Sequence, residues 1–167
     1  MNRRKMILLS FLSSIPLFSK SGFALPSDIS PTSVQKDTDF AAVYHCDFPQ
    51  EARYNAMMGN ITNHLNYYNA DPTKIKIIVV YHGPGVKFLM KTLLNSPWDK
   101  EEIDTKKHIS KAKDLTTYGV EFWICNNTIK NLNLKKEDFP DFCKVVPSGV
   151  AAITELQSKG FAYIKAQ

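Results

Sequence analysis

The sequence predicts an α/β protein with a three-layer α/β/α arrangement around a mostly parallel sheet of about five strands. Short runs of β-branched and aromatic residues alternate with helical patterns along the chain, and short turns join them. One run, at 75–81, is apolar on both faces, which is typical of a central parallel strand. Because strands that alternate with helices pair in parallel, the helices are expected to cover both faces of one sheet.

The first 24 residues have the pattern of a cleaved export signal. A basic start at 2–5 precedes an apolar stretch at 6–18, and small residues before Ala24 suit cleavage between Ala24 and Leu25. A membrane anchor is the alternative, but the stretch is short and contains several serines and a proline. The adjacent Arg3 and Arg4 also resemble a twin-arginine signal. We therefore expect an exported, periplasmic protein with no stable membrane insertion after cleavage.

The net charge and the number of cysteines argue against two classes of protein, nucleic-acid-binding proteins and disulfide-stapled scaffolds. The 167 residues carry a formal charge of +5, but the first 24 contain four basic residues and no acidic ones, so the remainder carries only +1. A mature chain so nearly neutral does not favour a nucleic-acid-binding surface. Cys46, Cys125 and Cys143 are too few for a disulfide-stapled scaffold, and their odd number leaves at least one thiol free, mixed or reversibly modified.

The order of predicted elements follows from the pattern. Residues 25–38, rich in Pro, Ser, Thr and Asp, predict a flexible lead-in, and 39–167 predict a single domain. A first strand at 40–45 precedes a helix that opens at Pro49 and has apolar residues at three- and four-residue steps: Tyr54, Met57, Met58, Ile61, Leu65 and Tyr68. The later strands are expected at 75–81, 120–125, 142–146 and 161–164. The later helices are expected at 86–94, 109–118, 128–134 and 149–159, the last one capped by Ser148.

Four strand-to-helix turns hold the unusual residues. They are His45-Cys46-Asp47, His82-Gly83-Pro84-Gly85, Cys125-Asn126-Asn127-Thr128 and Pro147-Ser148-Gly149. In a parallel sheet these turns share the carboxyl edge, where ligands bind in open α/β folds. Polar turns also arise simply because loops are polar. The histidines, cysteines and glycines in these four turns nevertheless favour the hypothesis that the turns form one shared pocket.

Cys125 is the candidate reactive group. It ends an apolar strand and precedes a helix, whose first N–H groups favour a thiolate, so we predict a lowered thiol pKa. Asn126, Asn127 and Thr128 are expected to cap that helix and to line the substrate site with Ser148. The alternative is that Cys125 is a small buried hydrophobic residue.

The His-Gly-Pro-Gly turn is the second part of the predicted pocket. Gly83 and Gly85 permit close backbone approach and, with the following helix start, binding of a small anion. His82 is either a proton carrier, a polar partner or a turn residue without chemistry. The turn lacks phosphate-loop spacing, and the cysteines and histidines lack zinc-ligand spacing, so neither a metal nor a cofactor is expected. The other histidines are weaker candidates: His45, His64 and His108, the last expected to be solvated.

Cys46 is a candidate resolving thiol for Cys125. The first and third strands of doubly wound sheets are commonly neighbours, which would bring the two strand ends together. The alternative is an unpaired thiol at a strand end, because disulfide geometry is demanding. Cys143 begins its strand at the opposite edge and is expected to take no part.

From about Tyr44 to the C-terminus, the chain resembles the small single-domain branch of the DsrE/DsrF-like family. The resemblance lies in the segments GNITN (59–63), HGPGVKFL (82–89), GVEFWICNNT (119–128), VVPSGV (145–150), LQ (156–157) and GFAYI (160–164). It implies a three-layer fold, a homo-oligomer and a link to sulfur-compound metabolism. In the sulfur-relay members a cysteine carries persulfide sulfur between proteins, and Cys125 stands at the position of the cysteine in this branch.

Three functions are therefore considered. The first is an exported sulfur-handling protein, in which Cys125 exchanges sulfane sulfur with a donor or acceptor protein. The second is a non-enzymatic, oligomeric module that binds a small anion in the same pocket. The third is a thiol redox protein that uses Cys46 and Cys125.

Overall fold

A computed structural model describes residues 24–166, so residues 1–23 of the predicted export signal lie outside the described part. In chain order the elements are β1 (Ser27–Asp28), the 3₁₀ helix η1 (Pro31–Ser33), β2 (Phe40–Cys46), α1 (Glu51–Tyr67), β3 (Ile75–Tyr81), the 3₁₀ helix η2 (Gly83–Leu89), α2 (Thr105–Thr116), β4 (Glu121–Cys125), α3 (Asn126–Asn131), the 3₁₀ helix η3 (Lys136–Asp138), β5 (Lys144–Val146), α4 (Gly149–Ser158) and β6 (Ala162–Lys165).

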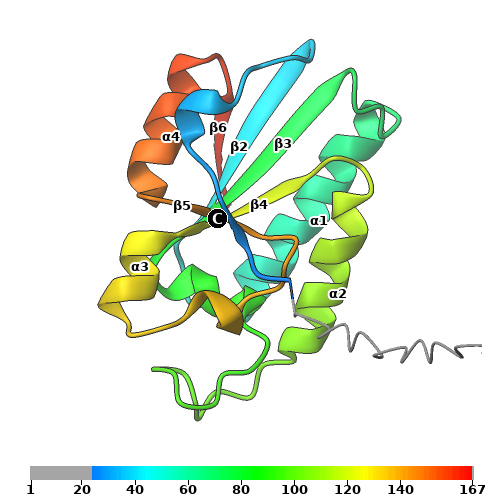
Figure 1. The fold of residues 1–167 in the computed structure, drawn as a ribbon. Helices are drawn as coiled ribbons and strands as arrows, with labels where there is room; N and C mark the ends of the chain where they lie inside the picture. Colours follow the sequence, from blue (N-terminus) through cyan, green and yellow to red (C-terminus); the bar gives the residue numbers. More distant parts are fainter. Residues whose placement is uncertain (1–23, 167) are drawn as a thin grey trace, which may run out of the picture.

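The strands form one parallel sheet in the order β1-β5-β4-β3-β2-β6. Helices α1 and α2 cover one face, and α4 with η1 covers the other (Figure 1). This confirms the predicted three-layer α/β/α class with a parallel sheet. The chain steps from β2 through β5 with α1 and α2 on one face, and then returns with α4 on the opposite face to place β6 beside β2. The order in which strands are added across the sheet reverses between β5 and β6. A right-handed crossover then places its helix on the opposite face of the sheet, where α4 lies.

Burial of apolar side chains in the core explains why β3 and α1 form where the sequence pattern predicts them. Strand β3 lies inside the sheet, and its alternate residues are buried in the two separate cores, as a strand that is apolar on both faces requires. Helix α1 buries the predicted stripe of Tyr54, Met57, Met58, Ile61 and Leu65 against the sheet. Full burial of each such side chain stabilises the fold by about 1.5–3 kcal/mol.

The segment at 25–38 differs from the flexible lead-in that its composition predicts. Ser27 and Asp28 pair with β5 as a sixth, edge strand. The η1 turn is held to α4 by the ammonium of Lys159, which donates to the carbonyl oxygens of Pro31, Thr32 and Val34. The pairing of β1 with β5 and the hydrogen bonds of Lys159 join residues that are distant in sequence. The polar composition of the segment alone therefore could not indicate that it is ordered.

Two helical predictions also differ from the structure. The stretch expected to be a helix at 86–94 is a 3₁₀ helix that ends at Leu89. Helix α2 begins at Thr105 rather than 109, because the carboxylate of Asp104 caps it by accepting from Lys107 N at 3.0 Å. The earlier start brings His108 into α2, where it is buried and bonded to a Glu51 carboxylate oxygen at 2.7 Å rather than solvated.

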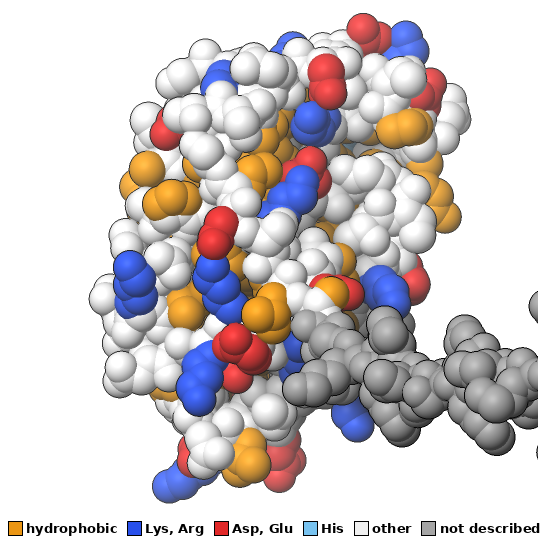
Figure 2. All heavy atoms as spheres, viewed as in Figure 1, with side chains coloured by type: hydrophobic (Ala, Val, Ile, Leu, Met, Phe, Trp, Pro, Cys, Tyr) orange, Lys and Arg blue, Asp and Glu red, His pale blue; other side chains and the backbone are white. Residues whose placement is uncertain are grey.

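The face shown in Figure 2 is mixed in charge. Basic and acidic side chains are interspersed over it, and small apolar areas lie between them. Several charged side chains of the described residues form ion pairs, such as Lys144 with Glu121 at 2.8 Å and Lys136 with Asp28 at 2.6 Å. In the described part of the chain, no helix combines the length and the apolar character needed to cross a bilayer.

Candidate functional site

The carboxyl edge of the sheet aligns three residues with polar or ionisable side chains at the ends of neighbouring strands. In the register, Cys46 lies beside Tyr81 and Tyr81 beside Ile124. One residue further along, the same alignment brings Asp47, His82 and Cys125 side by side. Because side chains alternate between faces, this second row points toward α4, whereas Cys46 and Tyr81 are buried in the core beneath α1.

The start of α4 shows how closely Cys125 and His82 approach each other. A Cβ atom added to Gly149, the first residue of α4, would lie 3.2 Å from the Cβ of Cys125 and 3.2 Å from the Cβ of His82. The two Cβ atoms are therefore within twice that distance of each other. Glycine at this position lets the first turn of a ten-residue helix pack close to the Cβ atoms of Cys125 and His82. Ser148 caps this helix as predicted, accepting a hydrogen bond from Ala151 N.

Cys125 is the last residue of β4 and also the N-cap of α3. Its side chain is only 5% exposed. The predicted capping role of Asn126, Asn127 and Thr128 is therefore wrong, because α3 begins at Asn126 and these residues form its first turn. The strand passes into the helix without an intervening residue. The thiol is consequently held at the edge of the sheet by two rigid elements.

The strand before Cys125 is itself locked in place. The indole N–H of Trp123 donates to a Glu121 carboxylate oxygen at 2.9 Å, and the same oxygen accepts from Lys144 at 2.8 Å. A fully buried indole thus has its one donor satisfied. This network ties β4, which carries Cys125, to the neighbouring strand β5.

The His-Gly-Pro-Gly turn is fixed by two hydrogen bonds from its backbone N–H groups and by close packing at its second glycine. His82 N donates to the carbonyl oxygen of Cys46 at 3.1 Å, and Gly83 N donates to Thr128 Oγ1 at 2.9 Å. Gly83 has a φ of +53°, a conformation that favours glycine. A Cβ on Gly85 would lie 2.2 Å from the Cys46 carbonyl oxygen, so this position accepts only glycine without rearrangement. Thr128, predicted to be a site residue, therefore contacts the turn rather than Cys125 through its hydroxyl.

His45 and Asp47 join His82 in a cluster that sequence reasoning missed. One donor atom from each of the three residues lies within 4.8 Å of the others. The imidazole rings of His45 and His82 are 4.6 Å apart between centroids. Burial lowers the pKa of His45, and the nearby Asp47 carboxylate partly opposes that shift. The signal available in the sequence is His45-Cys46-Asp47 itself, in which strand alternation turns the histidine and the aspartate to the same face.

The prediction that the Cys46 and Cys125 strands are neighbours is wrong. Strand β3 lies between β2 and β4. Two strand spacings amount to about 9–10 Å, beyond the roughly 7 Å that a disulfide can bridge between Cα atoms. The two thiols also point to opposite faces of the sheet. Cys46 is fully buried, its Sγ lies 3.9 Å from the carbonyl oxygen of Gly85, and burial raises its pKa well above the ordinary value.

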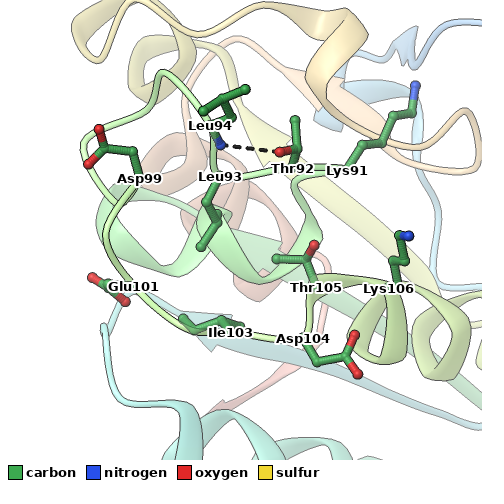
Figure 3. A pocket seen from close by; sticks show the side chains of 10 residues that line it. All are labelled: Lys91, Thr92, Leu93, Leu94, Asp99, Glu101, Ile103, Asp104, Thr105 and Lys106. Carbon is green, nitrogen blue, oxygen red and sulfur yellow. Dashed lines mark hydrogen bonds between the residues drawn. The ribbon is translucent and has the colours of Figure 1, made fainter.

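Two of the cavities formed by residues 24–166 bear on the predicted pocket, and only one of them adjoins it. One, of about 400 Å³, is formed mainly by the connection between η2 and α2, and no predicted site residue lines it. Figure 3 shows its charged groups, such as Lys91, Asp99 and Asp104, pointing in different directions rather than toward one point. The other, of about 290 Å³, is bounded by Asn126, Pro147 and residues of the β1 edge, so it adjoins the residue that follows Cys125.

Comparisons with known proteins agree with the architecture described above. The family model described as "DsrE/DsrF-like family" matches residues 41–166. Among solved structures, a protein of unknown function from Methanobacterium thermoautotrophicum is similar, with 28% identity, a TM-score of 0.61 and coverage of 76% of this chain and 99% of that one. A search of curated proteins finds no match. The family match covers three quarters of the sequence, and the chain therefore belongs to the DsrE/DsrF-like family, which is associated with sulfur metabolism.

Proposed function

We propose that this protein handles sulfane sulfur and that Cys125 carries it as a persulfide. The observation that supports the proposal most directly is the close approach of Cys125 and His82 at the start of α4, where their Cβ atoms each lie 3.2 Å from the position of a Cβ added to Gly149. An imidazole beside a thiol can remove its proton, and an adjacent helix start favours the resulting anion. Family membership makes sulfur the expected cargo.

The proposed transfer balances without an oxidant. His82 accepts the Cys125 proton, and the thiolate attacks the outer sulfur of a donor persulfide, R–S–SH. A new S–S bond forms at Cys125, the donor S–S bond breaks, and R–S⁻ leaves and takes the proton back from the imidazolium. The products are Cys125–S–SH and R–SH. A second thiol that attacks the outer sulfur of Cys125 in the same way would pass the sulfur on.

The limited exposure of Cys125 restricts the kind of sulfur donor that can reach its thiol. Only 5% of Cys125 is exposed, so little room is left for a reactant to approach its thiol. A small polysulfide or the terminal persulfide of a partner's extended segment fits this access better than a flat protein surface does.

The test is mass spectrometry after exposure of the mature chain to inorganic polysulfide. We expect a gain of sulfur on the peptide that contains Cys125, and none on the peptides of the buried Cys46 and Cys143. His82→Gln should slow the gain by about 10²–10⁴-fold if the imidazole acts as a general base. His64→Gln is the matched control because His64 lies in α1, outside the row at the sheet edge. An unmodified Cys125 under conditions that persulfidate a control thiol would refute the proposal.

A small-anion binding module remains the second candidate, favoured by the glycine start of α4 beside a nearly buried thiol. In that case Cys125 is only part of the wall of the pocket. A Cys125→Ser chain that still binds inorganic sulfite or sulfate as the unaltered chain does, while polysulfide leaves the unaltered chain unmodified, would favour this function. A direct Cys46–Cys125 redox couple is disfavoured by β3, which separates the two strands.

We also propose that the protein acts outside the cytoplasm. The support is the basic start, apolar stretch and small-residue cleavage site at 2–24. Expression in a bacterium with the native N-terminus, followed by N-terminal sequencing of the periplasmic fraction, should yield a chain that begins at Leu25. Retention of Met1 in a cytoplasmic product would contradict this proposal.

A further inference from the structure

The cluster of His45, Asp47 and His82 has the composition of a metal site. Two imidazoles and one carboxylate converge from the ends of β2 and β3, and among residues 24–166 no other group of three such side chains comes this close. We infer that these three residues bind a divalent transition-metal ion of the Zn²⁺ type. The inference does not depend on Cys125 or on sulfur as a cargo. An imidazole that binds a metal cannot also accept a proton at the same nitrogen, so bound zinc should slow the sulfur transfer proposed above.

The orientation of His45 is that of a ligand. Its Nδ1 is hydrogen-bonded to the hydroxyl of Tyr163 in β6 at 2.9 Å. Its Nε2 is buried and has no hydrogen-bond partner. Metal-binding histidines commonly use one ring nitrogen in an outer hydrogen bond, which fixes the ring and leaves the other nitrogen for the metal. A buried polar atom without a partner is costly in a folded protein, and an ion would satisfy it.

The other two donors are close enough to complete the site. Asp47 Oδ2 lies 4.0 Å from His45 Nε2, too far for a hydrogen bond between them. Zinc–nitrogen and zinc–oxygen bonds of about 2.0–2.2 Å place tetrahedral donors about 3.3–3.5 Å apart. The 4.0 Å pair therefore needs to close by less than about 1 Å. Because all three donor atoms lie within 4.8 Å of one another, no pair needs to close by more than about 1.5 Å. Side-chain rotation of Asp47, about 30% exposed, can shorten the distances from its carboxylate to the two histidines.

The positions of the two histidines are held independently of any ion. The backbone of His82 is bonded to Cys46, and its Cβ is wedged against the start of α4. His45 lies within β2, paired on one side with β3 and on the other with β6. Two ligands on rigid elements and a third at a strand end form a largely preorganised site.

The donor set indicates the kind of metal. Imidazole nitrogens suit zinc and other late first-row metals, whereas calcium and magnesium prefer sites made only of oxygen. Three protein ligands leave a fourth tetrahedral position for water or a substrate atom. The proposed site thus resembles an open, exchangeable centre rather than a closed structural one.

The test is a zinc titration of the chain from Leu25 to Gln167, freed of any purification tag, by isothermal calorimetry. We expect one ion per chain. Replacing a ligand, in His82→Ala or Asp47→Asn, should weaken the affinity by at least about 100-fold, because even the loss of an outer partner costs 10–100-fold. Tyr163→Phe, which removes only that outer hydrogen bond, should weaken it by about 10-fold.

His64→Ala provides the matched control. His64 Nδ1 also bonds to a tyrosine hydroxyl, that of Tyr44 at 3.1 Å, but His64 is not one of the three clustered donors. Its replacement should leave zinc binding unchanged. Binding to Co²⁺ in place of zinc should give the intense visible absorption of a tetrahedral site in the unaltered chain, and Asp47→Asn should remove it.

Three outcomes would overturn the inference. They are the absence of saturable zinc binding, affinities in both His82→Ala and Asp47→Asn within a few-fold of the unaltered chain, and loss of binding in Cys125→Ser. The last would assign the ion to the thiol instead. Because Cys125→Ser should bind zinc normally but cannot form a persulfide, failure of the metal site and failure of sulfur transfer are separately observable.

Discussion

Gly85→Ala should destabilise the protein strongly, because the added methyl group has nowhere to go. It would lie 2.2 Å from the carbonyl oxygen and 2.7 Å from the carbonyl carbon of Cys46, distances that real Cβ atoms do not adopt. Both obstacles are backbone atoms, so relief requires η2 to move away from the end of β2. Overpacking costs about 1–3 kcal/mol, and a clash with backbone belongs at the upper end, about 3 kcal/mol.

Thermal unfolding followed by circular dichroism measures the effect. For a domain of this size, about 3 °C of melting temperature corresponds to 1 kcal/mol, so Gly85→Ala should melt about 10 °C lower. Gly59→Ala is the matched control, because Gly59 lies inside α1 with nothing within 4 Å of an added Cβ. It should raise stability by about 0.5–1 kcal/mol through helix propensity. A Gly85→Ala chain that melts within about 2 °C of the unaltered protein would refute the reasoning.

Three further predictions concern buried polar groups. Glu101→Gln should lower the free energy of unfolding by about 2–3 kcal/mol, measured by urea denaturation, because it leaves the ammonium of Lys87, 2% exposed, without its charged partner. Burial lowers the pKa of His45, so the folded chain binds fewer protons than the unfolded chain below about pH 6.5. The free energy of unfolding should therefore fall as the pH drops below 6.5. The urea unfolding midpoint should fall less over this range in His45→Gln than in the unaltered chain. An equal fall of the midpoint in both chains would contradict this prediction. Burial raises the pKa of Cys46 and Cys143, so native-state alkylation at pH 8 should spare both, and rapid labelling of either would disprove their burial.

The local sequence pattern was sufficient to predict those elements whose structure depends mainly on their own residues. The three- and four-residue spacing of Tyr54, Met57, Met58, Ile61 and Leu65 predicted α1, and all five are buried. The apolar run of β3 predicted a central strand, and it lies inside the sheet. Ser148 was predicted as a cap because a short oxygen-bearing side chain before a helix satisfies its first N–H groups.

The site was only partly predictable, because its key relations connect strands that are distant in sequence. The four polar turns were placed correctly at strand ends. However, neither the separation of Cys46 from Cys125 by β3 nor the cluster of His45, Asp47 and His82 follows from local spacing. The His45-x-Asp47 alternation was visible, but its partner His82 is 35 positions beyond Asp47.

The sequence by itself determined the class of fold, the central strand, the principal helix and the placement of Cys125 where a strand meets a helix. Those features depend on periodicity and on turn residues, which act over a few positions. The tertiary structure decided which strands are neighbours, and hence that His82 lies between Asp47 and Cys125 in one row. It also decided that the start of α4 at Gly149 packs close to both Cys125 and His82. Strand order is set by packing of the whole sheet against both helical layers, so no local segment of the chain encodes it.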